Sequence, residues 1–205
     1  MNPNLKKIVA IIASLLVLGV LYYGSFLPLK KSSAYIRALQ NIGNAKTLKD
    51  FIDTVSVPLD MPSPVGQEEL VRNVGGSILS LIKANGENAA LTDAAVKFLM
   101  SYYEPILVRG RGMSFEQDLF IVGTMNEIAY LKTKDEKYLD NAVRYFEQGR
   151  ELGPERPQFL YSLLDVYRLK SDIPRATEVA QKLIALWPND TRLQAMFAPV
   201  PEKKN

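Results

Sequence analysis

The pattern of apolar and charged positions along the chain is most uneven near the amino terminus. From Ile8 to Leu27 no side chain is charged, and lysine pairs flank this run, with Lys30 and Lys31 on its carboxyl side. Twenty helical residues rise about 30 Å, the thickness of the hydrocarbon core of a bilayer. The pattern therefore predicts a single uncleaved membrane span, within an anchor segment of residues 1–31.

Two other interpretations of this run remain open, a cleaved signal peptide and a buried helix of a soluble domain. The apolar region of a signal peptide spans roughly 7–15 residues and ends at small residues, whereas Leu21, Tyr22 and Tyr23 are bulky. Basic residues on the two sides nearly balance, so the positive-inside rule gives only a weak bias. A short lysine-bearing amino terminus usually stays in the cytoplasm, so we expect the soluble domain on the extracytoplasmic side.

Apolar residues recur at helical spacing through residues 32–113, which predicts degenerate helical hairpins. Two short helices are expected over residues 32–56, the second with a capping box made by Thr47 and Asp50. An extended connection is expected next, because proline lacks the backbone N–H that a helix interior uses. Its prolines are Pro58, Pro62 and Pro64.

Two longer helices are predicted after the prolines. The first covers residues 67–84, and its adjacent glycines, Gly75 and Gly76, indicate close packing against another helix. The second starts near Thr92 and is disturbed near its end by Pro105. We find no convincing strand pattern, so the whole soluble part is expected to be all-α.

Small residues, aromatic residues and prolines recur at fixed spacings in residues 114–198. In a first unit, Ala142, Phe146, Gly149 and Pro154 follow one another four, three and five positions apart. A second unit lies 34 residues further on and has an aromatic residue in its first helix. Its matching positions are Tyr167, Ala176 and Pro188, whereas Ala180 and Leu183 stand where an aromatic and a small residue are usual.

This pattern resembles the tetratricopeptide repeat, a helix–turn–helix unit with a period of about 34 residues. The resemblance implies an α-solenoid, in which small residues let paired helices approach and the aromatic residue fills the gap to the next hairpin. It implies two repeats plus a short cap in residues 114–198, followed by a flexible tail, 199–205. The turn at residues 133–138 is too long for the family. An ordinary helical bundle is the alternative.

A looser resemblance relates residues 8–190 to the repeat region that follows the last membrane helix of bacterial O-antigen ligases and polymerases. It depends on residues 155–158 (ERPQ), on Phe51 and on residues 66–68 (GQE). Those proteins have several membrane helices, and their catalytic groups include histidine. This chain has one predicted span and no histidine, so the resemblance implies a detached accessory module and not the transferase.

In such solenoids the first helix of each hairpin lines the concave face. The resemblance therefore implies a partner-binding groove on the first helix of the second repeat. Its residues are Gln158, Tyr161, Asp165 and Arg168. Their mixed charges and the tyrosine suit a protein or peptide partner. A plain solvated helix face is the alternative.

The loop expected at residues 108–113 (VRGRGM) is a second candidate site, because Arg109 and Arg111 flank glycines there. Glycine lets the backbone approach a ligand, and arginine binds phosphate or carboxylate in a fork. An anionic lipid or glycan is therefore a candidate ligand. A flexible basic loop without a ligand is the alternative.

Composition argues against several classes of function. The chain has 205 residues and lacks cysteine and histidine, so it has neither a thiol nucleophile nor the commonest general base. Its 25 basic and 22 acidic residues give a net charge of +3, and the hairpin region has no basic face typical of nucleic-acid binding. It has no Walker loop, dinucleotide fingerprint or metal-ligand cluster. We therefore expect no enzyme activity, cofactor or metal, but a membrane-anchored scaffold for protein–protein interaction in envelope or polysaccharide assembly.

Overall fold

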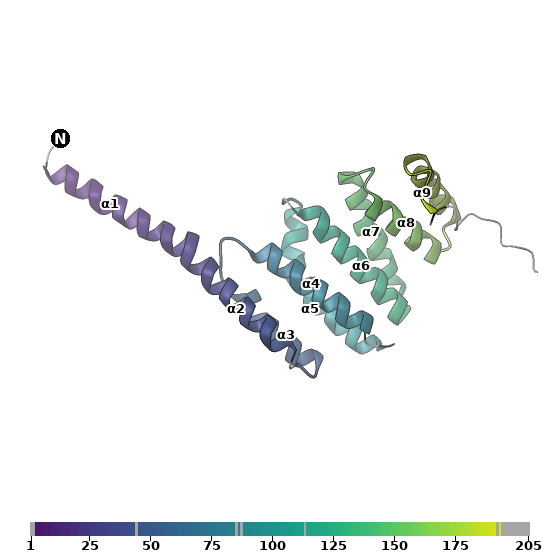
Figure 1. Ribbon diagram of the computed structural model, residues 1–205, viewed down its shortest axis with the longest axis horizontal. Helices are drawn as coiled ribbons and strands as arrows, with labels where there is room; N and C mark the ends of the chain where they lie inside the picture. The colour runs from purple at the N-terminus through teal and green to yellow at the C-terminus, as the bar shows by residue number, and fades with distance from the viewer. Residues whose placement is uncertain are drawn as a thin grey trace, which may run out of the picture. The chain divides into compact units, whose positions relative to one another are not determined.

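The fold is helical throughout the part of the chain that the structure describes (Figure 1). The structure is a computed structural model, and its described residues are 3–43, 45–84, 86, 88–112, 114–191 and 193. The all-α prediction is confirmed for these residues. They divide between two compact units, the first containing residues 1–78 and 97–106, the second residues 79–96 and 107–205.

Nine α-helices and one π-helical turn are present in the described residues. In chain order they are α1 (Pro3–Leu21), η1 (Tyr22–Phe26), α2 (Leu27–Ile42), α3 (Leu48–Asp60), α4 (Gln67–Ala84), α5 (Ala89–Arg109), α6 (Phe115–Thr133), α7 (Glu136–Leu152), α8 (Pro157–Leu169) and α9 (Ile173–Leu186).

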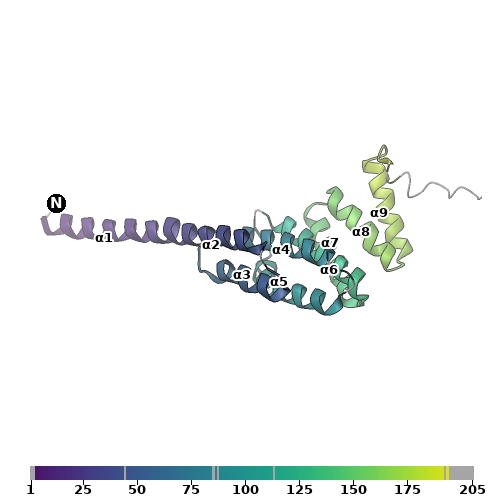
Figure 2. The same ribbon diagram turned by 60° about the horizontal axis from the view of Figure 1, so that its bottom comes forward.

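In the first unit, α1, η1 and α2 form one continuous helix from Pro3 to Ile42 (Figures 1 and 2). By length and composition it is able to cross a membrane, and none of the residues of α1 is buried in the protein. The helix expected after residue 31 is present, but it continues the preceding one, because no break occurs at that point. The π-turn ends two residues before Pro28, which lacks the N–H that an α-helical turn would use.

The helix α3 packs against α2. Its start is determined by a local signal, the capping box. The predicted capping box is present, since the backbone N–H of Asp50 donates to Thr47 Oγ1 over 3.1 Å and the backbone N–H of Thr47 donates to the Asp50 carboxylate. Pro58, expected in an extended connection, lies inside α3. Its ring is buried with Val55 and Leu59, and this packing compensates for the helical hydrogen bond that proline cannot make.

The helix α4 has the predicted bounds, but both ends of α5 differ from expectation. Asn88 caps α5 by accepting from the backbone N–H of Leu91 over 3.0 Å, so the helix begins before Thr92. It also continues through Pro105 to its end at Arg109. Of the two glycines expected at a close helix contact, Gly75 is buried, whereas Gly76 is exposed and a Cβ built there meets nothing within 4 Å.

In the second unit, α6 pairs with α7 through a tight turn. Lys134 adopts a left-handed conformation with φ of 59°, and the side chain of Asp135 accepts from the backbone N–H of Lys137. The turn predicted over residues 133–138 is therefore too long, because α6 ends at Thr133 and residues 136–138 already belong to α7.

Glycines allow the closest approaches between helices in this unit. A Cβ on Gly123 of α6 would come within 3.0 Å of the ring of Phe146 on α7, and a Cβ on Gly149 of α7 would overlap the ring of Phe159 on α8. Phe146 thus fills space within its own helix pair, α6 and α7, whereas Phe159 on α8 fills the space between its pair and the preceding one. The ring of Phe120 lies 6.1 Å from that of Phe146 and 5.9 Å from that of Phe159.

The second pair, α8 and α9, packs through the small and apolar residues of the second unit of the sequence pattern. Ala176, Ala180 and Leu183 of α9 are buried, as is Tyr167 of α8. Leu193, in the expected cap, is helical and buried. The rest of the cap beyond Leu193 and the expected tail, residues 199–205, lie outside the described residues.

Candidate functional site

A shallow, open hollow of about 470 Å³ lies between α6 and α8, the first helices of the two pairs. We call it the α6/α8 hollow. Residues on α6 four positions apart share one helix face, as do those on α8 three and four positions apart, which explains why these side chains converge. The lining residues are Glu127, Leu131, Asp165, Arg168 and Leu169. The two leucines are partly exposed, so the hollow combines apolar area with two carboxyl groups and one guanidinium.

The structure brings together half of the groove residues expected from the sequence. Asp165 and Arg168 line the hollow and are exposed. Gln158 and Tyr161 are half-buried and lie outside its lining. The hydroxyl of Tyr161 donates to the carboxylate of Asp190, which ties α8 to the turn after α9.

The residues contributed by α6 were missed by the sequence analysis. Leu131 lies 34 residues before Asp165, the same spacing that relates the two prolines of the repeat pattern. The 34-residue offset from Asp165 therefore predicts Leu131 as the corresponding residue of the first pair. Glu127 lies one helical turn before Leu131 and shares its face of the helix. The signal was lost because the supposed long turn after α6 left the register of this helix undetermined.

The carboxyl groups of the hollow are shifted toward their protonated forms. Burial, together with the nearby Asp165 carboxylate, raises the pKa of Glu127 to about 7, against the opposing effect of the Lys83 ammonium. Partial burial also raises the pKa of Asp165, against the effect of the Arg168 guanidinium. A carboxyl group with such a pKa changes charge near neutral pH and becomes ionised when a cation is placed beside it.

The hollow has the chemistry of a binding surface. Glu127 and Asp165 can accept hydrogen bonds from a cationic side chain, and Leu131 and Leu169 can contact its apolar stem. Within the described residues, no group of three or more acidic side chains is arranged to hold a metal ion. The chain itself contains neither histidine nor cysteine.

The second candidate site has a different local structure from the one expected. Val108 and Arg109 belong to α5, so the loop begins only at Gly110, and Met113 lies outside the described residues. The Nε of Arg109 donates to the backbone carbonyl of Arg111 over 3.2 Å. Both arginines are exposed, and neither lines the α6/α8 hollow.

Comparison with known proteins adds no relative. No protein-family model matches the chain, and no curated protein or solved structure matches it either. The resemblances to tetratricopeptide repeats and to O-antigen ligases therefore depend on the quoted residues alone. Function has to be argued from the geometry of the chain's own side chains.

Proposed function

We propose that this protein is a membrane-anchored scaffold of tetratricopeptide-like hairpins that binds a protein partner through the α6/α8 hollow. The single observation that carries the proposal is this hollow, formed by the first helices of two successive pairs. In solenoids of helical hairpins, these helices form the concave surface on which partners bind. The proposed setting is envelope or polysaccharide assembly, with the helical domain on the extracytoplasmic side.

The anchoring part of the proposal is supported by α1 and η1. The run from Ile8 to Leu27 is free of charged side chains, and its large apolar residues as far as Phe26 are exposed in the isolated chain. Exposed side chains of this kind are stable in hydrocarbon and unfavourable in water. Tyr22 and Tyr23, near the carboxyl end of the run, are exposed aromatic residues of the type found at membrane interfaces.

The repeat-like part is supported by the helix pairs of the second unit. Pairs α6–α7 and α8–α9 follow each other, and α7 contacts α8. Ala142 and Ala176 are both buried, on the second helices of the two pairs. Gly149 gives Phe159 room between the pairs. These close approaches are of the kind that lets successive hairpins stack in a repeat array.

The lining of the hollow favours a partner segment with a basic residue beside apolar ones. A lysine or arginine side chain would pair with Glu127 and Asp165, while its stem would cover Leu131. Arg168 at the rim repels a second basic residue, which limits the number of cations the hollow accepts. The surface is small, so it supplies one recognition contact within a larger interface.

Site-specific photo-crosslinking in the membrane-embedded, full-length protein tests this proposal. A photoreactive amino acid in place of Leu131 should capture a defined protein, and Asp165→Lys should abolish the capture because a positive charge would enter the cation site. Gln181, an exposed residue of α9 outside the hollow, is the matched control position. Equal capture from both positions, or capture unaffected by Asp165→Lys, refutes the hollow as the docking site.

The identity of the captured protein distinguishes the two settings considered for the scaffold. A polytopic glycan ligase or polymerase would identify the chain as a detached accessory module of such an enzyme. Any other envelope protein would favour the more general scaffold. Either result leaves the assignment of the hollow intact, because that assignment depends on the comparison of Leu131 with Gln181.

A further inference from the structure

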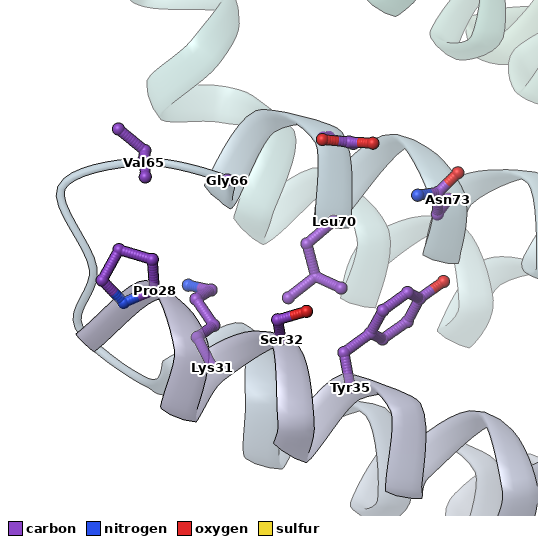
Figure 3. Close-up of a pocket in the computed structure, with 9 residues that line it drawn as sticks. Pro28, Lys31, Ser32, Tyr35, Val65, Gly66, Leu70 and Asn73 are labelled. Atoms are coloured by element: carbon purple, nitrogen blue, oxygen red, sulfur yellow. The ribbon is translucent and has the colours of Figure 1, made fainter. Parts of the chain in front are cut away.

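A second cavity, of about 260 Å³, lies in the first unit between α2 and the start of α4 (Figure 3). Lys31, Ser32 and Tyr35 extend from α2 toward it, and Leu70 extends from α4 on the opposite side. Glu69 also lines it. We call it the α2/α4 cavity. It is remote in sequence from the α6/α8 hollow, and the scaffold function leaves it without a role.

The most informative residue of this cavity is Lys31, which is only 4% exposed. Its ammonium donates to the backbone carbonyl of Met61 over 2.8 Å and to the side-chain oxygen of Gln67. Both acceptors are neutral. The Asp60 carboxylate is near enough to attract the ammonium, but no carboxylate of the described residues forms an ion pair with it. An ammonium has three donors, so one N–H is left for a group inside the cavity that Lys31 lines.

This arrangement is unexpected for a lysine that merely flanks a membrane span. A buried charge is unfavourable unless an opposite charge or a full set of hydrogen bonds compensates for it. Lys30, the preceding residue, is exposed and is the type of side chain that flanking requires. The burial of Lys31 therefore indicates a bound anion as the missing partner.

The position of the cavity along the helix indicates the source of that anion. Lys31 lies four residues beyond Leu27, the end of the uncharged run, on the same uninterrupted helix. Four residues correspond to about 6 Å of helix. The headgroup layer on each side of a bilayer is about 5–8 Å thick. Lys31 therefore reaches headgroup depth when the uncharged run fills the hydrocarbon core.

We propose that the α2/α4 cavity binds the headgroup of phosphatidylethanolamine, with the Lys31 ammonium donating to its phosphate. The inference requires the membrane anchoring of the proposed function, but not the partner site. Ser32 and Tyr35 supply hydroxyl donors for the phosphate oxygens. Pro28 and Val65 line the end of the cavity nearest the uncharged run (Figure 3), where they contact the glycerol region of the lipid, which carries the first apolar groups.

The acidic side chain on the lining selects among phospholipids. The carboxylate of Glu69 attracts the ammonium of an ethanolamine headgroup, which lies next to the phosphate in that lipid. A phosphatidylglycerol headgroup carries the same phosphate without a cation, so Glu69 opposes it. The pair of Lys31 and Glu69 thus matches a zwitterion better than an anion.

Native mass spectrometry of the full-length protein released from detergent micelles tests the lipid site. The wild type, loaded with phosphatidylethanolamine, should retain one lipid. Lys31→Met should weaken retention by about tenfold or more, because a charge-assisted hydrogen bond is lost. Lys30→Met removes the same charge from the adjacent, exposed position and should retain the lipid as the wild type does.

Two further variants keep the test decisive if Lys31→Met perturbs local packing. Ser32→Trp leaves the lysine in place and fills the cavity from an exposed position, so it should also weaken retention. Glu69→Gln should raise retention of phosphatidylglycerol relative to phosphatidylethanolamine. Retention unchanged in both Lys31→Met and Ser32→Trp overturns the proposal, as does equal loss in Lys30→Met.

The experiment also separates the lipid from a free anion and from failure of anchoring. Millimolar inorganic phosphate should leave the bound lipid in place, and complete displacement by phosphate would overturn the assignment to a lipid. Resistance of the chain to alkaline extraction from membranes measures anchoring by itself. A chain that resists extraction but retains no lipid refutes the cavity proposal alone, whereas an extractable chain refutes the anchor.

Discussion

The ring of Phe159 on α8 occupies the space in which Gly149 of α7 would carry a side chain. Phe159 is fully buried, and Gly149 is buried as well. The approach joins the two helix pairs of the second unit, because α7 belongs to the first pair and α8 to the second. A glycine that the sequence pattern places at a small-residue position thus determines how closely the pairs stack.

Gly149→Ala should therefore destabilise the protein despite the better helix propensity of alanine. Overpacking a core of this kind costs about 1–3 kcal/mol, which exceeds the gain of up to about 1 kcal/mol from removing a helical glycine. Gly76→Ala is the matched control, since a Cβ there meets nothing within 4 Å. It should raise the free energy of unfolding. Chemical denaturation of both variants checks the contrast, and equal effects would show that the two glycines have equivalent surroundings.

The turn between α6 and α7 gives a second prediction. Lys134 has a φ of 59°, a conformation that glycine adopts without the steric cost paid by other residues. Lys134→Gly should raise the free energy of unfolding by up to about 1 kcal/mol. Lys137→Gly, three residues later within α7, should instead lower it by about 1 kcal/mol. Thermal unfolding of the pair measures both signs, and destabilisation by Lys134→Gly would contradict the tight turn.

Local signals predicted the elements whose ends depend on neighbouring residues. The capping box of Thr47 and Asp50 and the bounds of α4 are examples, because caps and helix periodicity act over a few positions. Pro58 and Pro105 were misread as breaks. Both lie within helices. Pro105 is exposed, whereas Pro58 is buried, so that tertiary packing there outweighs the loss of a backbone hydrogen bond. A short stretch of sequence does not show whether a proline will be buried by distant parts of the chain.

The candidate site was partly predictable for the same reason. Asp165 and Arg168 follow from the face of a single helix, whereas Glu127 depends on how α6 is aligned with α8. That alignment depends on a two-residue turn whose left-handed residue is a lysine and not a glycine. Lys31 is buried by contacts with residues 30 and 36 positions away, so a sequence pattern predicts only a flanking charge there.

A hydrogen bond between the helix pairs gives a third prediction. The hydroxyl of Tyr167 on α8 donates to Glu147 on α7, which also pairs with Arg150 at 2.7 Å. Burial and the Glu147 carboxylate raise the pKa of Tyr167 to about 12. Tyr167→Phe should cost about 1–3 kcal/mol, because a hydrogen bond to a charged group is lost. Glu147→Gln should cost less, because an amide oxygen still accepts.

A double-mutant cycle isolates this interaction from the other effects of each substitution. The coupling energy of Tyr167→Phe with Glu147→Ala should be favourable by about 0.5–3 kcal/mol. Tyr161→Phe with Glu147→Ala is the control cycle, since the hydroxyl of Tyr161 donates to Asp190. Its coupling should be close to zero. A zero coupling in the Tyr167 cycle would mean that its hydroxyl and Glu147 act independently.

The titration of Glu127 makes stability depend on pH. Its pKa is about 7 in the folded chain against an ordinary value of 4.5, so the folded state binds more protons between these values. Stability contributed by the protonated form is therefore present below pH 4.5, declines as pH rises toward 7 and is lost above it. Asp165 has a raised pKa too and acts in the same direction, while Lys83 opposes the effect.

Glu127→Gln should therefore stabilise the protein at pH 8 and change little at pH 4.5, because glutamine mimics the protonated carboxyl group. The gain at pH 8 should be about 1–3 kcal/mol, since each unit of pKa shift corresponds to about 1.4 kcal/mol and partial solvation reduces the total. Glu155→Gln, at an exposed position, is the control and should be neutral at both pH values.

Because a cation in the α6/α8 hollow stabilises ionised Glu127, binding of a basic partner segment near pH 7 should release a proton. Calorimetric titrations of the captured partner in buffers of different ionisation enthalpy measure that release, and its persistence in Glu127→Gln would assign the proton to another group.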